Sequence, residues 1–227
     1  MNKNKLNKNQ YLNNEKKLIK IDKEANDKIG IMGGTFDPIH QGHLAMAEFI
    51  RDKYELDKII FIPSGNPPHK RNKTTNKFDR YNMCLLATES NEEFAVLDIE
   101  INREKNTYTS DTLEELSTMY PNSKIYFITG ADAICEIESW KDVEKNFKLA
   151  TFIATTRPGI SEDKSNQKIS ELIRKYNAEI LKVHTPSLDI SSTYVRERVC
   201  MEKTIKYIVP KEVEEYIYDK HLYKNGE

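Results

Sequence analysis

Residues 33–44 read GGTFDPIHQGHL. An apolar run at 29–32 precedes the two adjacent glycines, and a helical pattern of apolar residues follows them, spaced by three or four positions from Leu44 to Tyr54. We therefore expect the stretch to be the turn between a buried strand and a helix. A strand that passes through a glycine turn into a helix is the first half of a βαβ unit.

The same alternation of strand and helix continues along the chain. Short apolar runs with β-branched residues predict further strands at 59–62, 94–97, 125–128, 152–154 and 180–183. Helical spacing lies between most of them and again after Pro210. Alternating strands and helices predict an α/β fold with a mostly parallel sheet, and strands that are apolar throughout predict helices on both of its faces.

The overall charge limits the class of partner. The chain has 227 residues, with 35 basic and 36 acidic side chains and a formal net charge of −1. Such a balance gives no bulk field that would attract nucleic acid or a membrane surface, so we expect small-molecule partners. No apolar stretch approaches the roughly 20 residues that a membrane span needs.

The chain is expected to hold one domain, at 29–223, preceded by a polar basic extension at 1–28. The extension carries eight lysines against four acidic residues and is rich in asparagine, so we expect it to be mobile or weakly helical. The cysteines, Cys84, Cys135 and Cys200, are widely spaced and form no C-x-x-C pair. They suit a reducing compartment, and a cytoplasmic location is predicted.

The glycine turn contains His40 and His43 on either side of Gly42. Two imidazoles at the start of a helix can both donate hydrogen bonds to a phosphate group, which the helix N-terminus also favours. The stretch lacks both G-x-G-x-x-G and the P-loop pattern, which argues against a dinucleotide-binding oxidoreductase and a P-loop ATPase. A second anion site is predicted at 190–196, where Ser191 or Ser192 can cap a helix and Arg196 lies one turn further on.

Both stretches resemble the nucleotidyltransferase superfamily that carries an H-x-G-H motif. The resemblance implies a Rossmann-like fold, in which His40 and His43 contact a nucleoside triphosphate. Three further stretches are similar to bacterial nicotinate-nucleotide adenylyltransferases: P-P-H-K at 67–70, T-Y-T-S-D-T at 107–112, and Gly130-Ala131-Asp132 followed by Trp140. For T-Y-T-S-D-T we also expect Ser110 or Asp111 to cap the following helix.

The family resemblance implies transfer of AMP from ATP to nicotinate mononucleotide, giving nicotinate adenine dinucleotide and pyrophosphate. The groups that would neutralise charge in this reaction are His40, His43, Lys70 and Arg196. The residues expected to bind ATP are Gly33, Gly34, Thr35, Phe36, Gly130, Asp132, Ser191 and Ser192. The residues expected to bind nicotinate mononucleotide are His69, Thr109 and Trp140, with the Trp140 ring over the pyridine.

A phosphate oxygen is itself an adequate nucleophile, so the reaction needs alignment and charge neutralisation and no covalent intermediate on the protein. Mg²⁺ is the expected cofactor. It would be held mainly by the phosphates, because the sequence suggests no dedicated carboxylate cage.

Several alternatives stay open. Within the superfamily they are pantetheine-phosphate adenylyltransferase, whose members are typically shorter, and a cytidylyltransferase. Outside it, a nucleotide sensor without turnover is possible. Glu136 stands where related enzymes can place an aromatic ring, so the pyridine pocket can be built differently. A homo-oligomer is also open, because Tyr207, Tyr216 and Tyr218 suit a subunit contact as well as a core.

Overall fold

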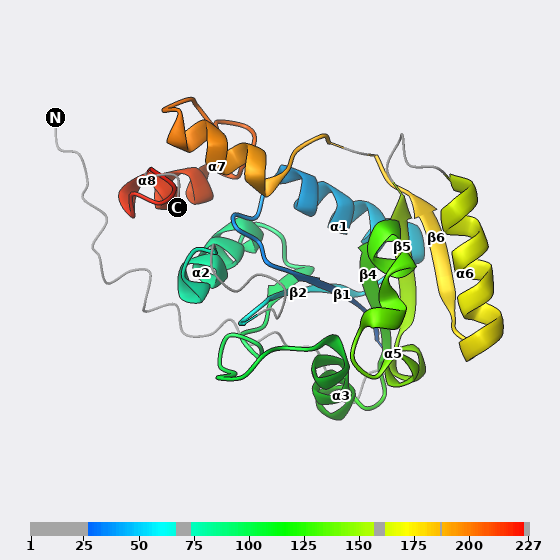
Figure 1. The fold of residues 1–227 in the computed structure, drawn as a ribbon. Coiled ribbons are helices and arrows are strands. Elements are labelled where there is room, and N and C mark those ends of the chain that lie inside the picture. Colours follow the sequence, from blue (N-terminus) through cyan, green and yellow to red (C-terminus); the bar gives the residue numbers. More distant parts are fainter. Residues whose placement is uncertain (1–26, 67–73, 157–161, 187, 225–227) are drawn as a thin grey trace, which may run out of the picture.

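A six-stranded parallel sheet forms the centre of the molecule (Figure 1). The computed structural model describes residues 27–66, 74–156, 162–186 and 188–224. The strands are β1 (Lys28–Gly34), β2 (Lys58–Pro63), β3 (Phe94–Val96), β4 (Lys124–Gly130), β5 (Thr151–Thr156) and β6 (Ile180–His184). Their order is β3-β2-β1-β4-β5-β6, and each of the five pairings between neighbours is parallel. The predicted strands and the α/β class are confirmed.

Helices connect the strands and complete the chain. They are α1 (Gln41–Tyr54), α2 (Lys77–Thr88), α3 (Thr109–Met119), α4 (Ala131–Cys135), the 3₁₀ turn η1 (Ile137–Ser139), α5 (Val143–Leu149), α6 (Glu162–Tyr176), α7 (Ser192–Cys200) and α8 (Lys211–Asp219). The sequence did not predict α4, η1 and α5. The predicted N-terminal extension lies outside the described residues except for its last two, and Lys28 already begins β1.

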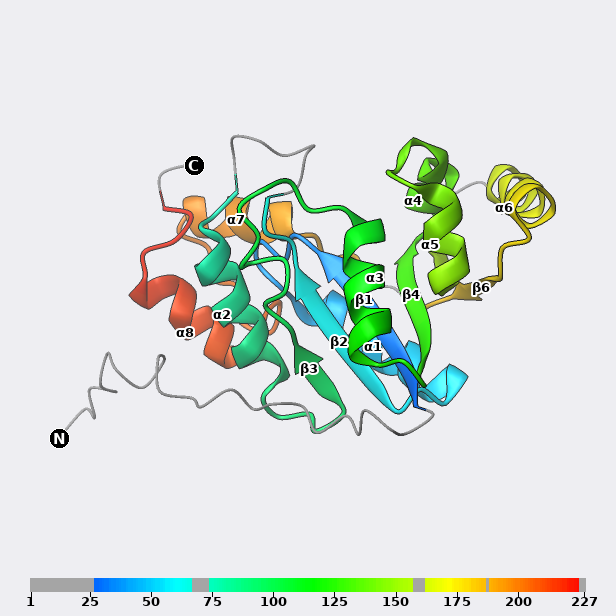
Figure 2. The same cartoon turned by 90° about the horizontal axis from the view of Figure 1, so that it is seen from below.

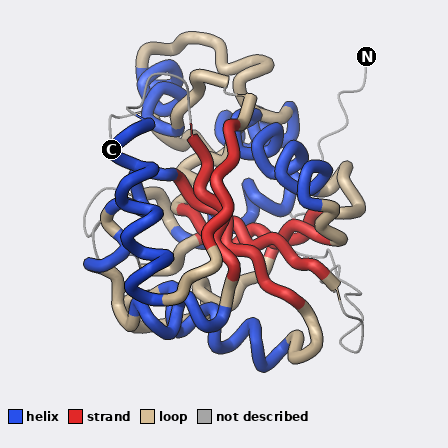
Figure 3. The backbone as a smooth tube through the Cα atoms, turned by 90° about the vertical axis from the view of Figure 1, so that its right-hand side faces the viewer, coloured by secondary structure: helices blue, strands red, loops and turns tan. Residues whose placement is uncertain are grey.

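Side chains that alternate along the strands build a core on each face of the sheet. On β1, Met32 belongs to one core and Ile31 to the other. The first core contains apolar residues of α1, α2, α7 and α8, and the second those of α3, α4, α5 and α6. Figure 2 shows α3 and α5 in front of the strands, and Figure 3 shows the strands running between helices on either side. The prediction of helices on both faces is confirmed.

The strand order reverses between β1 and β4. From β1 the chain builds β2 and β3 on one side, then crosses to β4 and builds β5 and β6 on the other. Loops that leave the carboxyl ends of β1 and β4 therefore diverge and open a crevice, the usual ligand site of such sheets.

The two predicted helix caps have different outcomes. Ser191 is the N-cap of α7, and its hydroxyl accepts a hydrogen bond from the Tyr194 main-chain N–H at 3.1 Å. The prediction that Ser110 or Asp111 caps α3 is wrong, because Tyr108 is the N-cap and makes no side-chain cap. The helix begins at Thr109, so Ser110 and Asp111 already lie inside its first turn, and Asp111 pairs with Lys141 Nζ at 2.9 Å.

The tyrosines near the C-terminus fall into two groups. Tyr216 is 2% exposed and belongs to the core, with its hydroxyl donating to Asp79 at 2.7 Å. Tyr207 is 82% exposed, and Tyr218 is also exposed.

Within the described ranges, no helix is long and apolar enough to cross a membrane.

Candidate active site

The turn after β1 brings its main chain close to neighbouring rings. A side chain at Gly34 would place its Cβ 2.9 Å from the Phe36 ring, so only glycine fits without displacing that ring. The left-handed backbone expected of a glycine occurs instead at Phe36, with φ 50°. The Phe36 ring is 3% exposed and packs edge-on against His43, with centroids 5.1 Å apart.

The two histidines of the turn stack on each other. Their ring centroids are 3.7 Å apart and their planes differ by 26°. His40 is the N-cap residue of α1 and is 3% exposed, whereas His43 is half-buried. The His40 main-chain N–H donates to Nδ1 of His43 at 3.3 Å. In its neutral form the His43 ring therefore carries its proton on Nε2, where it can act as a hydrogen-bond donor.

Helix α7 is fastened to the same turn, although it comes more than 150 positions later in the sequence (Figure 1). The Ser192 hydroxyl donates to the Pro38 carbonyl at 2.8 Å, and Arg196 Nη1 donates to the Asp37 carbonyl at 2.7 Å. Arg196 Nη2 donates to the Thr193 hydroxyl at 3.1 Å. The structure thus joins the two stretches that the sequence had marked as separate anion sites.

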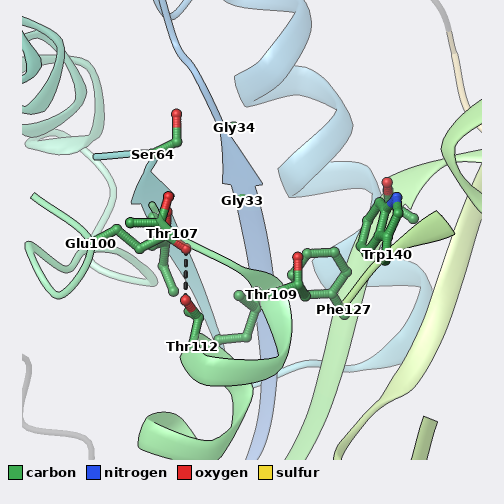
Figure 4. Close-up of a pocket in the computed structure, with 12 residues that line it drawn as sticks. Gly33, Gly34, Ser64, Glu100, Thr107, Thr109, Thr112, Phe127 and Trp140 are labelled. Atoms are coloured by element: carbon green, nitrogen blue, oxygen red, sulfur yellow. Dashed lines mark hydrogen bonds between the residues drawn. The ribbon is translucent and has the colours of Figure 1, made fainter. Parts of the chain in front are cut away.

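A cavity of about 270 Å³ lies at the carboxyl ends of β1, β2 and β4. Its lining residues are Ile31, Gly33, Gly34, Ile62, Ser64, Glu100, Thr107, Thr109, Thr112, Phe127, Thr129 and Trp140. Figure 4 shows Trp140 and Phe127 toward one end of it, and Ser64, Thr107 and Glu100 toward the other. Trp140 meets Phe127 edge-on, with ring centroids 6.2 Å apart.

One wall of the cavity is held by a chain of polar contacts. The Thr112 hydroxyl donates to Glu100 Oε1 at 2.7 Å, as the dashed line in Figure 4 marks, and accepts from Arg103 Nη1 at 2.8 Å. Arg103 Nη2 in turn pairs with Glu115 at 2.6 Å. These contacts tie the first turn of α3 to the loop before it and give the wall a fixed shape.

The chain has close relatives among known proteins. It is 49% identical over 202 residues to a probable nicotinate-nucleotide adenylyltransferase of Thermoanaerobacter sp. (strain X514), covering 88% of this chain and 96% of that protein. It is 48% identical over 199 residues to a protein of the same name from Moorella thermoacetica, covering 87% and 92%. This chain belongs to the nicotinate-nucleotide adenylyltransferase family. The resemblance seen in the sequence is confirmed.

Two further comparisons agree with this family. The family model described as Cytidylyltransferase-like matches residues 31–198. Among solved structures, the Plasmodium falciparum nicotinic acid mononucleotide adenylyltransferase complexed with NaAD is similar with a TM-score of 0.72. It is 26% identical and covers 88% of this chain and 100% of its own. The Rossmann-like fold expected from the resemblance is therefore confirmed.

The structure of this adenylyltransferase brings most of the predicted site residues to one edge of the sheet. Gly33, Gly34, Thr109 and Trp140 line the same cavity. Gly130 is the last residue of β4. Asp132 is exposed and lies in the first turn of α4, with its carboxylate folded back over Gly130. The predicted residues His69 and Lys70 lie outside the described residues.

The sequence missed Arg80 of α2, which is 1% exposed. It lies on the buried face of α2 with Met83, Cys84 and Ala87, at the spacing of one helical stripe. An arginine among apolar residues at helical spacing can be recognised in the sequence, so Arg80 could have been identified as an unusual buried cation. Glu100, Thr107 and Thr112 were not assigned as site residues either, although Thr107 and Thr112 belong to the T-Y-T-S-D-T stretch that the sequence had marked.

The described residues contain no group of three His, Cys, Asp or Glu side chains that could hold a metal ion. Around the crevice this family member has imidazoles, hydroxyls, main-chain groups and Arg196, which can bind anions, beside the carboxylates of Glu100 and Asp132. A divalent metal there would take most of its ligands from the oxygens of a bound phosphate.

Proposed function

We propose that this chain transfers AMP from ATP to nicotinate mononucleotide, giving nicotinate adenine dinucleotide (NaAD) and pyrophosphate. The observation that carries the proposal is that Gly33 and Gly34 border two features at once. They line the cavity that contains Trp140 and Thr109, and they lead directly into the turn that contains His40 and His43. Two substrates bound on either side of these glycines would meet with their phosphates together.

The proposed reaction is a direct displacement. An oxygen of the mononucleotide phosphate attacks the α-phosphorus of ATP, a new phosphorus–oxygen bond forms, and the bond to the β-phosphate oxygen breaks. The electron pair leaves with pyrophosphate, so no group is transferred to the protein. The protein aligns two polyanions and neutralises charge on the bridging and leaving oxygens.

Charge neutralisation is assigned to the turn and to α7. His43 is the less buried imidazole of the turn, so its Nε2–H is assigned as the donor, and the main-chain N–H of buried His40 supports its orientation through the 3.3 Å contact to Nδ1. Arg196 uses Nη1 and Nη2 for protein contacts and is half-buried, so its guanidinium charge lies close to the turn. Lys70 is proposed to add a further positive charge.

Each substrate is assigned to its own set of residues. For ATP the set includes main-chain groups at Thr35 and Phe36, because the Phe36 ring is buried, and it is completed by Gly130, Asp132, Ser191 and Ser192. For nicotinate mononucleotide, Trp140 offers a flat ring for the pyridine and Thr109 a helix N-terminus for its carboxylate. His69 is proposed to contact the same substrate.

We propose Mg²⁺ as the cofactor, bound through the phosphate oxygens of ATP. It would supply additional positive charge to the leaving pyrophosphate. We also propose that the enzyme acts in the cytoplasm. Its exposed residues Tyr207 and Tyr218 leave a contact between identical subunits as a further proposal, which sedimentation would test.

Labelled ATP tests the function. With ATP labelled at the α-phosphate, the label should move into NaAD only when nicotinate mononucleotide is present. With ATP labelled at the γ-phosphate, it should move into pyrophosphate at the same rate. If neither label leaves ATP in the presence of nicotinate mononucleotide, although ATP still binds, the result would support a nucleotide sensor and contradict the proposal.

A further inference from the structure

Arg80 is a charged side chain placed inside the protein. It is 1% exposed, and its neighbours on the same face of α2, Met83 and Cys84, are fully buried apolar residues. Burial of a guanidinium is costly unless its donors are satisfied, so an arginine at this position requires a specific set of partners.

Within the described part of the chain, its hydrogen-bond partners are main-chain carbonyls. Nη1 donates to Thr35 at 2.6 Å, and Nη2 donates to Ser64 at 2.6 Å and to Gly65 at 3.3 Å. Nε donates to Thr75 at 3.1 Å. The rigid fork of one guanidinium therefore spans the loop after β1, the loop after β2 and the segment before α2.

Two of these loops border the cavity. Gly33 and Gly34 come immediately before Thr35, and Ser64 itself lines the cavity wall. The loops also contact each other, since the Ser64 main-chain N–H donates to the Gly34 carbonyl at 2.8 Å. Strands β1 and β2 pair as far as Gly34 and Pro63, and Arg80 adds a side-chain connection beyond the point where this pairing ends.

The fork can do this because it stays charged. Burial lowers the pKa of the Arg80 guanidinium from its ordinary value, and the nearby Asp37 carboxylate acts in the opposite direction. Arginine retains its proton at neutral pH even so, and hydrogen bonds from a charged donor are stronger than those from a neutral one.

We propose that Arg80 is a positioning residue that fixes the end of β1 and its turn (33–36) against the end of β2 and its turn (63–66), and so aligns the two substrates. The inference rests on the proposed function for its effect on turnover. The loop geometry itself can be measured without any substrate.

The test compares Arg80→Lys with Met83→Ala in the full chain. Lysine keeps the charge and loses the fork, whereas Met83→Ala removes a buried side chain from the same helix and leaves the hydrogen bonds of Arg80 in place. We expect Arg80→Lys to lower kcat by about 10- to 100-fold, the size of a lost charge-assisted hydrogen bond, with a smaller change in KM. Met83→Ala should lower the melting temperature and leave kcat of the folded enzyme within about twofold.

Hydrogen exchange supplies a readout that does not depend on activity. In Arg80→Lys, amide exchange at 33–36 and 63–66 should be faster than in the parent, while β4 to β6 should be unchanged. Exchange and kcat that match those of the parent would overturn the inference, as would faster exchange spread evenly over the whole domain. A parent enzyme that forms no NaAD contradicts the proposed function and leaves the exchange comparison valid.

If Arg80→Lys does not fold, Arg80→Ala is refolded with free guanidinium ion, which can occupy the vacated space. A rate that rises with guanidinium and not with methylammonium supports the role of the fork. Equal rates with the two ions contradict it.

Discussion

The Tyr223 hydroxyl donates a 2.8 Å hydrogen bond to the Asp37 carboxylate and so joins the end of the chain to the turn that holds His40 and His43. Both partners are buried, and the second oxygen of Asp37 accepts from the Thr75 main-chain N–H at 3.1 Å. Burial, with the Asp37 charge as a second cause, raises the pKa of Tyr223 far above its ordinary value. The hydroxyl therefore stays protonated and remains a donor.

Tyr223→Phe should lower the free energy of unfolding by about 1–3 kcal/mol, because a buried carboxylate loses one of its donors. Urea unfolding of the variant and the parent measures this. The matched control is Tyr218→Phe on exposed Tyr218, which should change little. Equal losses in the two variants would show that the contact with Asp37 contributes nothing.

His43→Ala should lower kcat by about 100-fold or more, with a smaller change in either KM, because it removes a donor that acts on charge formed in the transition state. Initial rates of pyrophosphate release measure this. The control is His221→Asn, since His221 is exposed and its φ of 55° is one that asparagine tolerates. Unchanged turnover in His43→Ala would remove His43 from the mechanism.

Arg196→Ala should raise the KM for ATP by about 10-fold or more, because both the charge and the clamp on the Asp37 carbonyl are lost. Arg198→Ala is the matched control on the same helix. Arg198 donates to the Thr204 carbonyl and to the Tyr194 hydroxyl, and neither belongs to the turn. An ATP KM that moves equally in both variants would contradict the role of Arg196.

Trp140 is the single tryptophan of the chain, so tryptophan fluorescence reports on this one residue of the cavity wall. Nicotinate mononucleotide should change this emission in a saturable way through contact with the ring. Trp140→Ala should raise the KM for the mononucleotide by about 10-fold, and Trp140→Phe should restore part of the affinity. Emission that does not respond to saturating mononucleotide would place the pyridine elsewhere.

Glu138 links η1 to α6 through Lys168, Lys175 and Tyr176, and these hydrogen bonds lower the pKa of its carboxyl to about 2. A depressed pKa in the folded state stabilises the protein above the unfolded value of 4.5, and this stabilisation is lost as the pH falls toward 2. Glu138→Gln should therefore lower the melting temperature at pH 7. The difference in melting temperature between the variant and the parent should become smaller below pH 4.5.

The control for this series is Glu89→Gln, since Glu89 is an exposed residue at the end of α2. Its melting temperature should follow that of the parent at every pH. A Glu138→Gln difference that stays constant from pH 7 to pH 3 would contradict the assigned role of the carboxylate.

The parts of the fold that the sequence predicted are those with a clear period. Each strand contains an apolar run, and long helices such as α1 and α8 show regular apolar spacing. The elements α4, η1 and α5 contain five, three and seven residues. Segments of two turns or fewer have no measurable period, so only contacts with the rest of the chain define them.

Local sequence predicted the chemistry of the site better than its geometry. His40, His43 and Arg196 could be identified as anion-binding groups, but the contact of Arg196 with the Asp37 carbonyl joins segments that are distant in the sequence. The cap of α3 was misplaced because the extended path through Tyr108 depends on tertiary contacts. Arg80 shows the same limit, since its partners come from two separate connections, one after β1 and one between β2 and α2.

The most direct measurement offers the purified enzyme ATP and Mg²⁺ with one acceptor at a time: nicotinate mononucleotide, nicotinamide mononucleotide, phosphopantetheine or none. The rate of pyrophosphate release and the identity of the dinucleotide are recorded. We expect the highest kcat/KM with nicotinate mononucleotide, with NaAD and pyrophosphate formed in equal amounts. Release that needs no acceptor, or that is faster with phosphopantetheine, would contradict the account.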